Sequence, residues 1–408
     1  MSLGRYLREA FLGPAYFWHR RLIRASKTWS PERIAAYQAQ KTAPLLSRYG
    51  DVVRDKAHYR EQLARYTRLG LPGLTSTIRT GGTTGSPFAF AMDTFARRQK
   101  ERAYIFDIWA EVGYRPFDTR VVYRGNIGDA LISYNRLENA WSINPARLTA
   151  ATRDSVIAFL RGLGPFFLHV YPSSLFSFID TLGAEVFRAL PVRGVMAGSE
   201  AFPAGQMAAF EREYGIGVAH WYGHSEYACL ARYCRLCQGF HFYPTYGAVE
   251  FVPQVEAEAG LCHIVATSFN AVGTQFVRYD TGDLARVSAT ACSAPFVRVD
   301  AIEGRVQEYF IDRGGQLRAF GPYLFGIHNR FWDILSAIQF VQSEPGRLSV
   351  RVALKDAGEQ AWLEAFLRDR FAVVELDMVY VDAIKRTAAG KHRYYINQLQ
   401  AGAAPART

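Results

Sequence analysis

Apolar positions in the middle of the chain follow two alternating patterns. Between residues 118 and 223, short runs that are mostly apolar alternate with longer segments whose apolar residues recur every three or four positions. The runs predict strands at 118–125, 165–171, 192–198 and 217–223, and the segments predict helices at 152–163, 172–190 and 203–215. Strands that alternate with helices of this length predict a parallel α/β sheet.

The pattern is different on either side of this region. The first 70 residues read as helices, of which 30–50 is the clearest, because Ser30 precedes a proline at its start and Gly50 follows its end. After residue 240, glycines separate strand-like pieces at 246–252, 262–269 and 275–280. From about residue 304 a β-rich stretch, a helix and a strand follow, at 340–355, 360–371 and 373–381.

The predicted architecture is therefore an α/β protein with two domains. Residues 1–303 are expected to form a large N-terminal domain with mixed and parallel sheets and flanking helices. Residues 304–408 are expected to form a small α+β domain. A chain of 408 residues is long enough for this division, because single cores stop growing near ~250–300 residues. Ligands often bind in the cleft between two such bodies.

Composition narrows the class of protein. No run approaches the ~20 apolar residues of a membrane span, and the N-terminus lacks the features of a signal peptide, so we expect a cytoplasmic protein. The net charge of +11 suits nucleic acid, anionic lipid or small anions such as nucleotides and coenzyme A. Nucleic acid ranks last because no recognition helix, RNA-binding signature or long basic run is present. The basic segment 5–27 is expected to pack on the main domain rather than bind a membrane.

A stretch rich in glycine and threonine precedes the alternating region. Residues 79–87 read RTGGTTGSP. Glycine, serine and proline mark surface turns, whereas clustered backbone N–H groups and threonine hydroxyls surround phosphate groups. Taken alone, the stretch predicts either a surface loop or a phosphate-binding loop.

The stretch 220–228, HWYGHSEYA, ends a predicted strand in Tyr222 and continues into polar residues that include Ser225 and Glu226. Ligands in open α/β sheets bind beyond the carboxyl ends of strands. There a tyrosine can stack on a base, and a carboxylate can hold a metal ion bound to phosphates. The alternative is a plain turn from strand to loop.

The stretch 277–287, VRYDTGDLARV, presents the carboxylate of Asp283 at a Thr-Gly-Asp sequence. A fixed carboxylate accepts hydrogen bonds from two neighbouring hydroxyls, as in a ribose. The alternative is a hairpin turn, in which this tripeptide is common.

Together with 303–316 and 385–396, these three stretches resemble the adenylate-forming superfamily of acyl-CoA ligases and adenylation domains. Their order and separation carry the resemblance, which covers roughly residues 75–396. The short chain and the sequences GSEAFP, YGHSE and GRVQEY are most similar to the phenylacetate–CoA ligase branch. The nearest group within it is the capsular-polysaccharide-biosynthesis (CapK-like) relatives.

The resemblance implies a role for each stretch. The loop would hold the β- and γ-phosphates of ATP and release pyrophosphate, through Thr80, Gly81, Gly82, Thr83, Thr84 and Gly85. The adenosine would be bound by Tyr222 and Gly223 at the adenine, by Asp283 and Arg305 at the ribose, and by Ser199 and Glu200, which line the acyl and adenine site. Near the α-phosphate the implied residues are Ser225, Glu226 as the Mg²⁺ ligand, and Lys391, which stabilises the negative charge as the carboxylate attacks phosphorus.

The implied activity is that of an ATP-dependent, AMP-forming ligase. It would activate a carboxylic acid as an acyl adenylate, release pyrophosphate and pass the acyl group to coenzyme A. An amine or a carrier thiol is the alternative acceptor. A protein of another class, a nucleotide-binding homologue without catalysis, is disfavoured because Lys391, Glu226 and Asp283 are all present.

Three positions depart from the superfamily pattern. Phe88 stands where the loop often carries a lysine after its proline, so the handling of pyrophosphate is expected to differ in detail. Ser225 replaces a threonine and keeps its hydroxyl. Gln307 replaces a hinge aspartate, which bears on the second half-reaction rather than on adenylation.

A cluster of cysteines follows the strand that ends in Tyr222. Cys229, Cys234, Cys237 and His241 have the spacing C-x4-C-x2-C-x3-H, which can supply four ligands to a structural Zn²⁺ ion. Cys262 is the alternative that would take the place of one of these four ligands. Against zinc, cysteine is commonly a small buried apolar residue, and only one C-x-x-C pair is present.

Two further polar residues follow predicted strands. Arg124 is expected either to meet an anionic substrate or to form a structural ion pair. His169 is expected to be a core histidine with a satisfied hydrogen bond rather than a residue of the acyl pocket.

Overall fold

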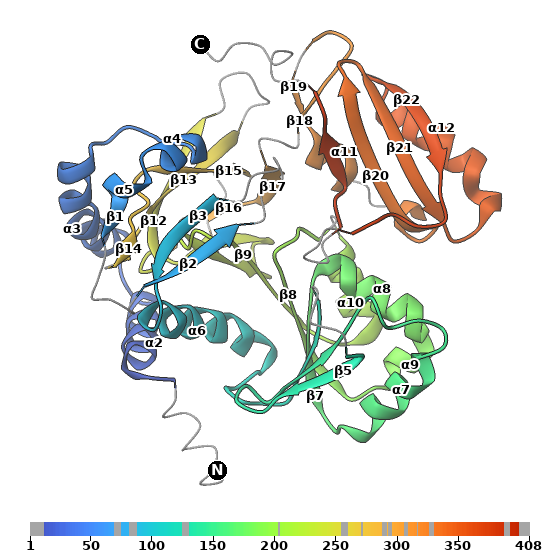
Figure 1. The fold of residues 1–408 in the computed structure, drawn as a ribbon, viewed down its shortest axis with the longest axis horizontal. Coiled ribbons are helices and arrows are strands. Elements are labelled where there is room, and N and C mark those ends of the chain that lie inside the picture. Colours follow the sequence, from blue (N-terminus) through green and yellow to red (C-terminus); the bar gives the residue numbers. More distant parts are fainter. Residues whose placement is uncertain are drawn as a thin grey trace.

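A nine-stranded sheet forms the centre of the structure, a computed structural model (Figure 1). The residues that it describes are 12–68, 75–80, 88–124, 130–202, 205–253, 260–270, 272–287, 292, 296–305, 309–315, 317–325, 330–386 and 392–399. In spatial order the strands of this sheet are β16 (Arg298–Val299), β11 (Gly239–Phe242), β10 (Leu230–Cys234), β9 (Val218–Gly223), β8 (Val192–Gly198), β7 (Phe166–Val170), β4 (Arg120–Tyr123), β6 (Ala140–Ile143) and β5 (Ile132–Asn135).

The middle of this sheet is parallel and its edges are antiparallel. Strand β8 pairs in parallel with β7 and β9, and β4 pairs in parallel with β6 and β7. Strands β10, β11 and β16 extend the sheet from β9 in antiparallel pairs. The parallel α/β region predicted between residues 118 and 223 is confirmed.

Helices cover both faces of the parallel strands. Successive side chains of a strand point to opposite faces, so each strand contributes residues to two apolar cores. Phe166, Leu168 and Val170 of β7 pack in one apolar core, and Phe167 packs in another. The first core includes residues of α7 (Arg153–Gly162), α8 (Pro172–Leu182), α9 (Ala184–Arg188) and α10 (Gln206–Tyr214). The second includes residues of α2 (Pro14–Ser26) and α6 (Ala96–Trp109), which η1 (Ala110–Val112) follows.

Two four-stranded sheets complete the large domain. One has the order β1 (Thr67–Arg68), β14 (Gly273–Thr274), β3 (Phe88–Asp93) and β2 (Thr75–Thr80). The other has the order β12 (Gly247–Pro253), β13 (Leu261–Ser268), β15 (Tyr279–Arg286) and β17 (Ala301–Arg305). The helices that precede them are α3 (Pro31–Tyr49), α4 (Lys56–Glu61) and α5 (Leu63–Tyr66). Tyr49, Tyr59 and Tyr66 join residues of both sheets in a third apolar core.

The smaller C-terminal domain has its own sheet and its own apolar core. The sheet has the order β22 (Glu375–Tyr380), β21 (Arg347–Leu354), β20 (Leu335–Glu344) and β23 (Tyr395–Asn397). The other elements are β18 (Tyr309–Ile311), β19 (Leu317–Ala319), α11 (Phe320–Phe325), η3 (Arg330–Trp332), η4 (Ala357–Glu359) and α12 (Gln360–Arg370). The core joins Leu363 and Leu367 of α12 to Phe340 of β20. The predicted fold class is confirmed.

Two predicted elements differ from the structure. The helix predicted at 172–190 is divided into α8 and α9 at Gly183, whose φ of 91° no helix accommodates. The strand predicted at 275–280 is wrong for its first four residues, because β14 ends at Thr274 and β15 begins at Tyr279. Between these strands, the Gln275 N–H donates to the Tyr66 carbonyl, so a contact distant in sequence decides the local conformation.

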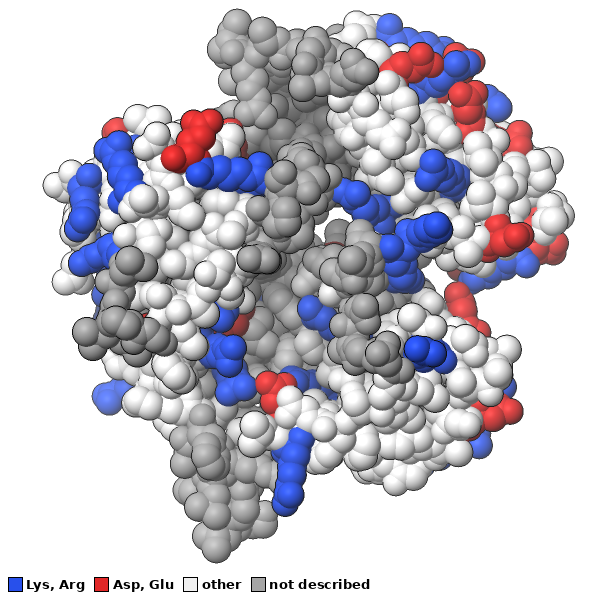
Figure 2. All heavy atoms as spheres, in the orientation of Figure 1, with Lys and Arg blue, Asp and Glu red and all other residues white. Residues whose placement is uncertain are grey.

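Basic side chains are spread over the face drawn in Figure 2, on the large and the small domain alike, rather than gathered in one stripe. Within the described residues, none of the helices is both long enough and apolar enough to cross a bilayer.

Candidate functional site

The carboxyl ends of four adjacent parallel strands bring together the residues that follow them. Arg124 follows β4, Tyr171 follows β7 and Ser199 follows β8, while Tyr222 is next to last in β9. Trp221 pairs with Gly198, so Tyr222 and Ser199 are neighbours at this edge. In open α/β sheets this edge binds ligands.

Tyr222 and Asp283 are in direct contact, although they belong to different sheets. The Tyr222 hydroxyl donates to Asp283 Oδ2 at 2.7 Å. In the strand register Asp283 of β15 lies opposite Arg305 of β17. Asp283 therefore links two other residues predicted at the adenosine, because its side chain contacts Tyr222 and its backbone lies opposite Arg305; the Arg305 side chain lies outside the described part.

Hydrogen bonds of the neighbouring Thr281 hold the backbone of Asp283 in place. Its N–H donates to Thr281 Oγ1 at 3.1 Å, and that hydroxyl donates to the Ile264 carbonyl at 2.9 Å. Burial, followed by the negative charge of Asp283, raises the pKa of Tyr222 well above its ordinary value, so the phenol keeps the proton it donates. Asp283 lies within a strand that has a bulge after Leu284, and the alternative prediction of a hairpin turn is wrong.

Glu226 is almost fully buried and accepts contacts from three side chains. Lys56 Nζ lies 2.9 Å from Oε1, Tyr279 donates to Oε1 at 3.3 Å, and His224 Nδ1 lies 3.1 Å from Oε2. Burial by itself would raise the pKa of Glu226, but His224 and Lys56 outweigh it and hold the pKa well below its usual range. The carboxylate is therefore ionised.

His224 links this carboxylate to Cys229. Its other ring nitrogen, Nε2, lies 3.5 Å from Cys229 Sγ. Burial alone would lower the pKa of His224, but Cys229 and Glu226 raise it to about 10. A protonated imidazole can donate from both nitrogens, which is consistent with one contact on each side. Ser225, between His224 and Glu226, is exposed.

Lys56 joins this cluster to the base of the glycine-rich stretch. Its Nζ lies 5.9 Å from the centre of the Phe88 ring, within the range of a cation–π contact. Phe88 pairs with Thr80 across the β2–β3 hairpin, and these two residues flank the stretch 81–87 in the sequence. Gly81, Gly82, Thr83, Thr84, Gly85 and the Thr80 side chain lie outside the described residues.

Ser199 and Glu200 follow β8 directly. Ser199 is exposed and has a φ of 68°, a left-handed conformation that costs a non-glycine residue roughly 1–3 kcal/mol and is found most often at functional sites. Glu200 Oε2 accepts from the Ser173 N–H at 3.1 Å, in the first turn of α8. The side chains that follow β8 are thus held beside the start of that helix.

Gly198 is required because the Trp221 ring lies against it. A Cβ atom at this position would be 2.4 Å from the indole. We expect Gly198→Ala to lower the free energy of unfolding by about 1–3 kcal/mol, as overpacking of a core does. Gly162→Ala is the matched control, since a Cβ there meets no atom within 4 Å. Urea denaturation measures both, and equal effects would contradict the packing argument.

Arg124 and His169 form a hydrogen-bonded pair at the same edge. Arg124 Nη1 donates to His169 Nε2 at 2.7 Å, and its guanidinium lies 4.4 Å from the centre of the Tyr171 ring. Burial, then Arg124, lowers the pKa of His169 well below its ordinary value, so the neutral ring accepts this hydrogen bond. Among the described residues, no carboxylate lies within ion-pair distance of Arg124. The hydrogen bond agrees with the prediction that His169 is a core histidine. The Arg124 guanidinium, with no such carboxylate beside it in the described part, is able to meet an anion.

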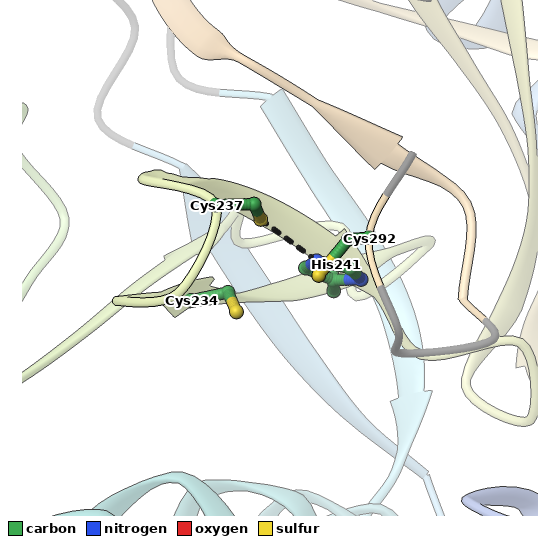
Figure 3. A group of neighbouring side chains, drawn as sticks. All are labelled: Cys234, Cys237, His241 and Cys292. Carbon is green, nitrogen blue, oxygen red and sulfur yellow. Dashed lines mark hydrogen bonds between the residues drawn. The ribbon is translucent and has the colours of Figure 1, made fainter. Parts of the chain in front are cut away.

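The cysteines separate into two places. Cys229 contacts His224, as described above, whereas Cys234, Cys237 and His241 gather with Cys292 (Figure 3). Cys292 was not predicted as a ligand, because it lies 51 residues after His241 and has no motif around it. Cys262 is buried in β13 and does not belong to the group that the structure brings together.

The structure also locates residues that the sequence did not single out. Lys56, 170 residues from Glu226, had no motif to identify it. Arg386 Nη1 lies 3.3 Å from Ser173 Oγ and so connects the small domain to the start of α8. Lys391 lies outside the described residues.

A cavity of about 500 Å³ borders α4 and includes His58 and Asp280, but none of the predicted site residues lines it.

Several solved structures with this architecture are ligases, and some of them hold an acyl-AMP. That of 2-hydroxyisobutyryl-CoA ligase in the postadenylation state, in complex with R3-HIB-AMP, has a TM-score of 0.57 at 16% identity and covers 94% of this chain and 88% of its own. The chain has the fold of the adenylate-forming ligases. Amide bond synthetase McbA from Marinactinospora thermotolerans has a TM-score of 0.52 at 14% identity, covering 80% and 68%.

Anthranilate CoA ligase AuaEII in complex with anthranoyl-AMP has a TM-score of 0.50 at 15% identity and covers 78% of this chain and 65% of its own. No family model matches the chain, and no curated protein sequence matches it. At these identities the likeness establishes the fold alone.

Proposed function

We propose that the protein is an ATP-dependent, AMP-forming ligase that activates a carboxylic acid as an acyl adenylate, releases pyrophosphate and transfers the acyl group to coenzyme A. The observation that carries this proposal is the contact of Tyr222 with Asp283 beside the buried, ionised Glu226, at the carboxyl edge of the parallel strands. The fold shared with adenylate-forming ligases supports it.

Asp283 and Tyr222 would bind the adenosine. The hydroxyl of Tyr222 orients the Asp283 carboxylate, which can accept hydrogen bonds from the ribose hydroxyls. The ring of Tyr222, with Gly223 beside it, would flank the adenine, and Arg305, opposite Asp283 in the register, would reach the ribose from the next strand. Ser199, beside Tyr222, and Glu200 would border the adenine and the acid.

Glu226 fits the role of a ligand for the Mg²⁺ ion that accompanies ATP. A carboxylate has about four acceptor positions, and the contacts with Lys56, Tyr279 and His224 occupy three of them. The bound ion would supply positive charge to the phosphates. Lys56, between Glu226 and the base of the 81–87 loop, would add a cation on the phosphate side, where Phe88 replaces the lysine common in the superfamily.

The small domain, which we propose to be residues 304–408, would deliver Lys391 to the acid. Arg386, five residues before Lys391, already contacts Ser173 in the first turn of α8, and the N–H of Ser173 donates to Glu200. A lysine brought to this place would stabilise negative charge on the carboxylate and the α-phosphate, near Ser225. Arg124 would meet the acid from the end of β4.

The acceptor has a second candidate. An amide bond synthetase shares the fold, and the sequences GSEAFP, YGHSE and GRVQEY support the branch of phenylacetate–CoA ligases and CapK-like relatives. An amine on a sugar or another small molecule, or a carrier thiol, is therefore the alternative to coenzyme A. All three kinds of acceptor would react with the same acyl adenylate, so the first half-reaction is tested first.

ATP–pyrophosphate exchange with a panel of aryl, fatty, hydroxy and amino acids tests this proposal. We expect exchange that depends on one class of acid and falls at least about a hundredfold in Lys391→Ala, in line with the loss of a preorganised charge at the transition state. Lys385→Ala, an exposed lysine on the same segment, is the matched control. Absence of exchange with every acid, despite ATP binding, would favour a nucleotide-binding protein without catalysis.

A further inference from the structure

Three cysteines and one histidine gather on the outer strands of the nine-stranded sheet. Cys234 ends β10, Cys237 lies in the turn that follows, and His241 lies in β11, while Cys292 comes from the connection between β15 and β16. Their ligand atoms all lie within 4.8 Å of one another. In Figure 3 the Cys292 and Cys237 side chains approach the His241 ring from two separate segments of chain.

His241 is fully buried in this group. Its Nε2 lies 3.1 Å from Cys237 Sγ, and a thiol is only a weak partner for an imidazole. Within the described residues its Nδ1 makes no hydrogen bond of good geometry, although the main-chain oxygen of Phe296 lies near it. A buried imidazole with such weak partners costs folding free energy unless another group satisfies it. A metal ion at Nε2 would do so.

We propose that Cys234, Cys237, His241 and Cys292 bind one structural Zn²⁺ ion. Three thiolates and an imidazole are a common ligand set for structural zinc. In a tetrahedral site the ligand atoms are roughly 3.5–3.8 Å apart, given Zn–S and Zn–N distances of about 2.3 and 2.0 Å. The longest separations, up to 4.8 Å, therefore need only a small contraction, and the 3.1 Å between Cys237 Sγ and His241 Nε2 needs a small lengthening. Four protein ligands leave no open position, so the ion would not take part in the ligase chemistry.

The zinc ion would link two segments of the chain, each of which is next to a strand with a proposed nucleotide-binding residue. The β10–β11 hairpin holds three ligands, and β10 pairs directly with β9, in which Tyr222 lies opposite Ala231. Cys292 lies on the chain that leaves β15, the strand of Asp283, and leads to β16, which pairs with β11. The ion would thus cross-link the neighbour of β9 to the chain that follows β15. These are the strands of Tyr222 and Asp283, whose side chains are 2.7 Å apart.

The test is the metal content of the full-length protein, purified in the presence of zinc and measured by plasma mass spectrometry. We expect about one zinc per chain in the wild type, and less than about a tenth of that in Cys292→Ser and Cys237→Ser. Cys262→Ser, which changes a buried cysteine outside the group, should keep its zinc. Cys229→Ser should keep it too, although the spacing in the sequence also offers Cys229 as a ligand.

A second measurement keeps the proposal testable where a variant fails to fold. Cobalt titrated into the metal-free wild type should give the intense visible bands of a tetrahedral ion together with thiolate-to-metal absorption, and zinc should abolish both. Added zinc should also raise the melting temperature of the metal-free protein. A wild type that takes up no zinc, a cobalt spectrum without thiolate bands, or a disulfide between two of the three cysteines would overturn the proposal. So would loss of zinc from Cys229→Ser with retention in Cys292→Ser.

Discussion

Replacement of Asp283 by alanine is expected to weaken ATP binding about a hundredfold. The carboxylate would accept hydrogen bonds from two ribose hydroxyls, and each bond to a charged acceptor contributes about 1.5–3 kcal/mol. A loss of about 3 kcal/mol corresponds to a factor of roughly one hundred in the dissociation constant. Tyr222→Phe removes only the hydroxyl that orients the carboxylate at 2.7 Å, so we expect a loss of roughly fivefold. Isothermal titration calorimetry measures both.

ATP analogues that lack one ribose hydroxyl distinguish the loss of the ribose contact from a general loss of structure in the variant. With 2′-deoxy-ATP and 3′-deoxy-ATP the wild type should lose affinity, and the additional penalty of Asp283→Ala should shrink, because the partner hydroxyl is already missing. An equal penalty for ATP and for both deoxynucleotides would contradict the assignment of Asp283 to the ribose. The unfolding curve of each variant provides the check on folding.

Glu226→Ala is expected to lower the free energy of unfolding by about 3 kcal/mol. The substitution removes the carboxylate that lies 2.9 Å from Lys56 and 3.1 Å from His224, and unpaired buried charge is costly. Lys56→Met in the same background should restore part of the loss, with a coupling energy of about 1–3 kcal/mol between the two positions. Urea denaturation of the two single variants and the double variant gives this value.

Glu185→Ala provides the comparison for an ordinary surface pair. The Glu185 side chain is 89% exposed where it meets Arg188, and such pairs contribute less than about 1 kcal/mol. Additive effects of Glu226→Ala and Lys56→Met would mean that the two charges do not depend on each other. That result would also remove the support for Lys56 as a cation on the phosphate side of the site.

The parallel part of the fold could be predicted because its strands are buried on both faces. Runs such as 165–171 and 192–198 are almost continuously apolar, and glycine or proline bounds them. Where a contact from elsewhere in the chain decides the conformation, the sequence pattern was insufficient. Gln275, whose N–H donates to the Tyr66 carbonyl, lies between two strands rather than within one.

The candidate site was predictable to the extent that its residues lie in recognisable stretches. Tyr222, Asp283 and Glu226 belong to such stretches, and the structure brings Asp283, from another sheet, into contact with Tyr222 near the carboxyl ends of the parallel strands. Lys56 and Cys292 do not, because each becomes significant only through packing against residues far away in sequence. A single lysine or cysteine without a partner at a defined spacing carries no signal of its own.

The measurement that tests the central claim most directly is the fate of a labelled oxygen. Once pyrophosphate exchange has identified an acid, that acid is prepared with ¹⁸O in its carboxylate and turned over with ATP and an acceptor. If the carboxylate attacks the α-phosphorus, one labelled oxygen passes to AMP, and mass spectrometry will detect it there. Label in inorganic phosphate with formation of ADP, or no transfer of label to AMP, would contradict an acyl adenylate and with it the proposed function.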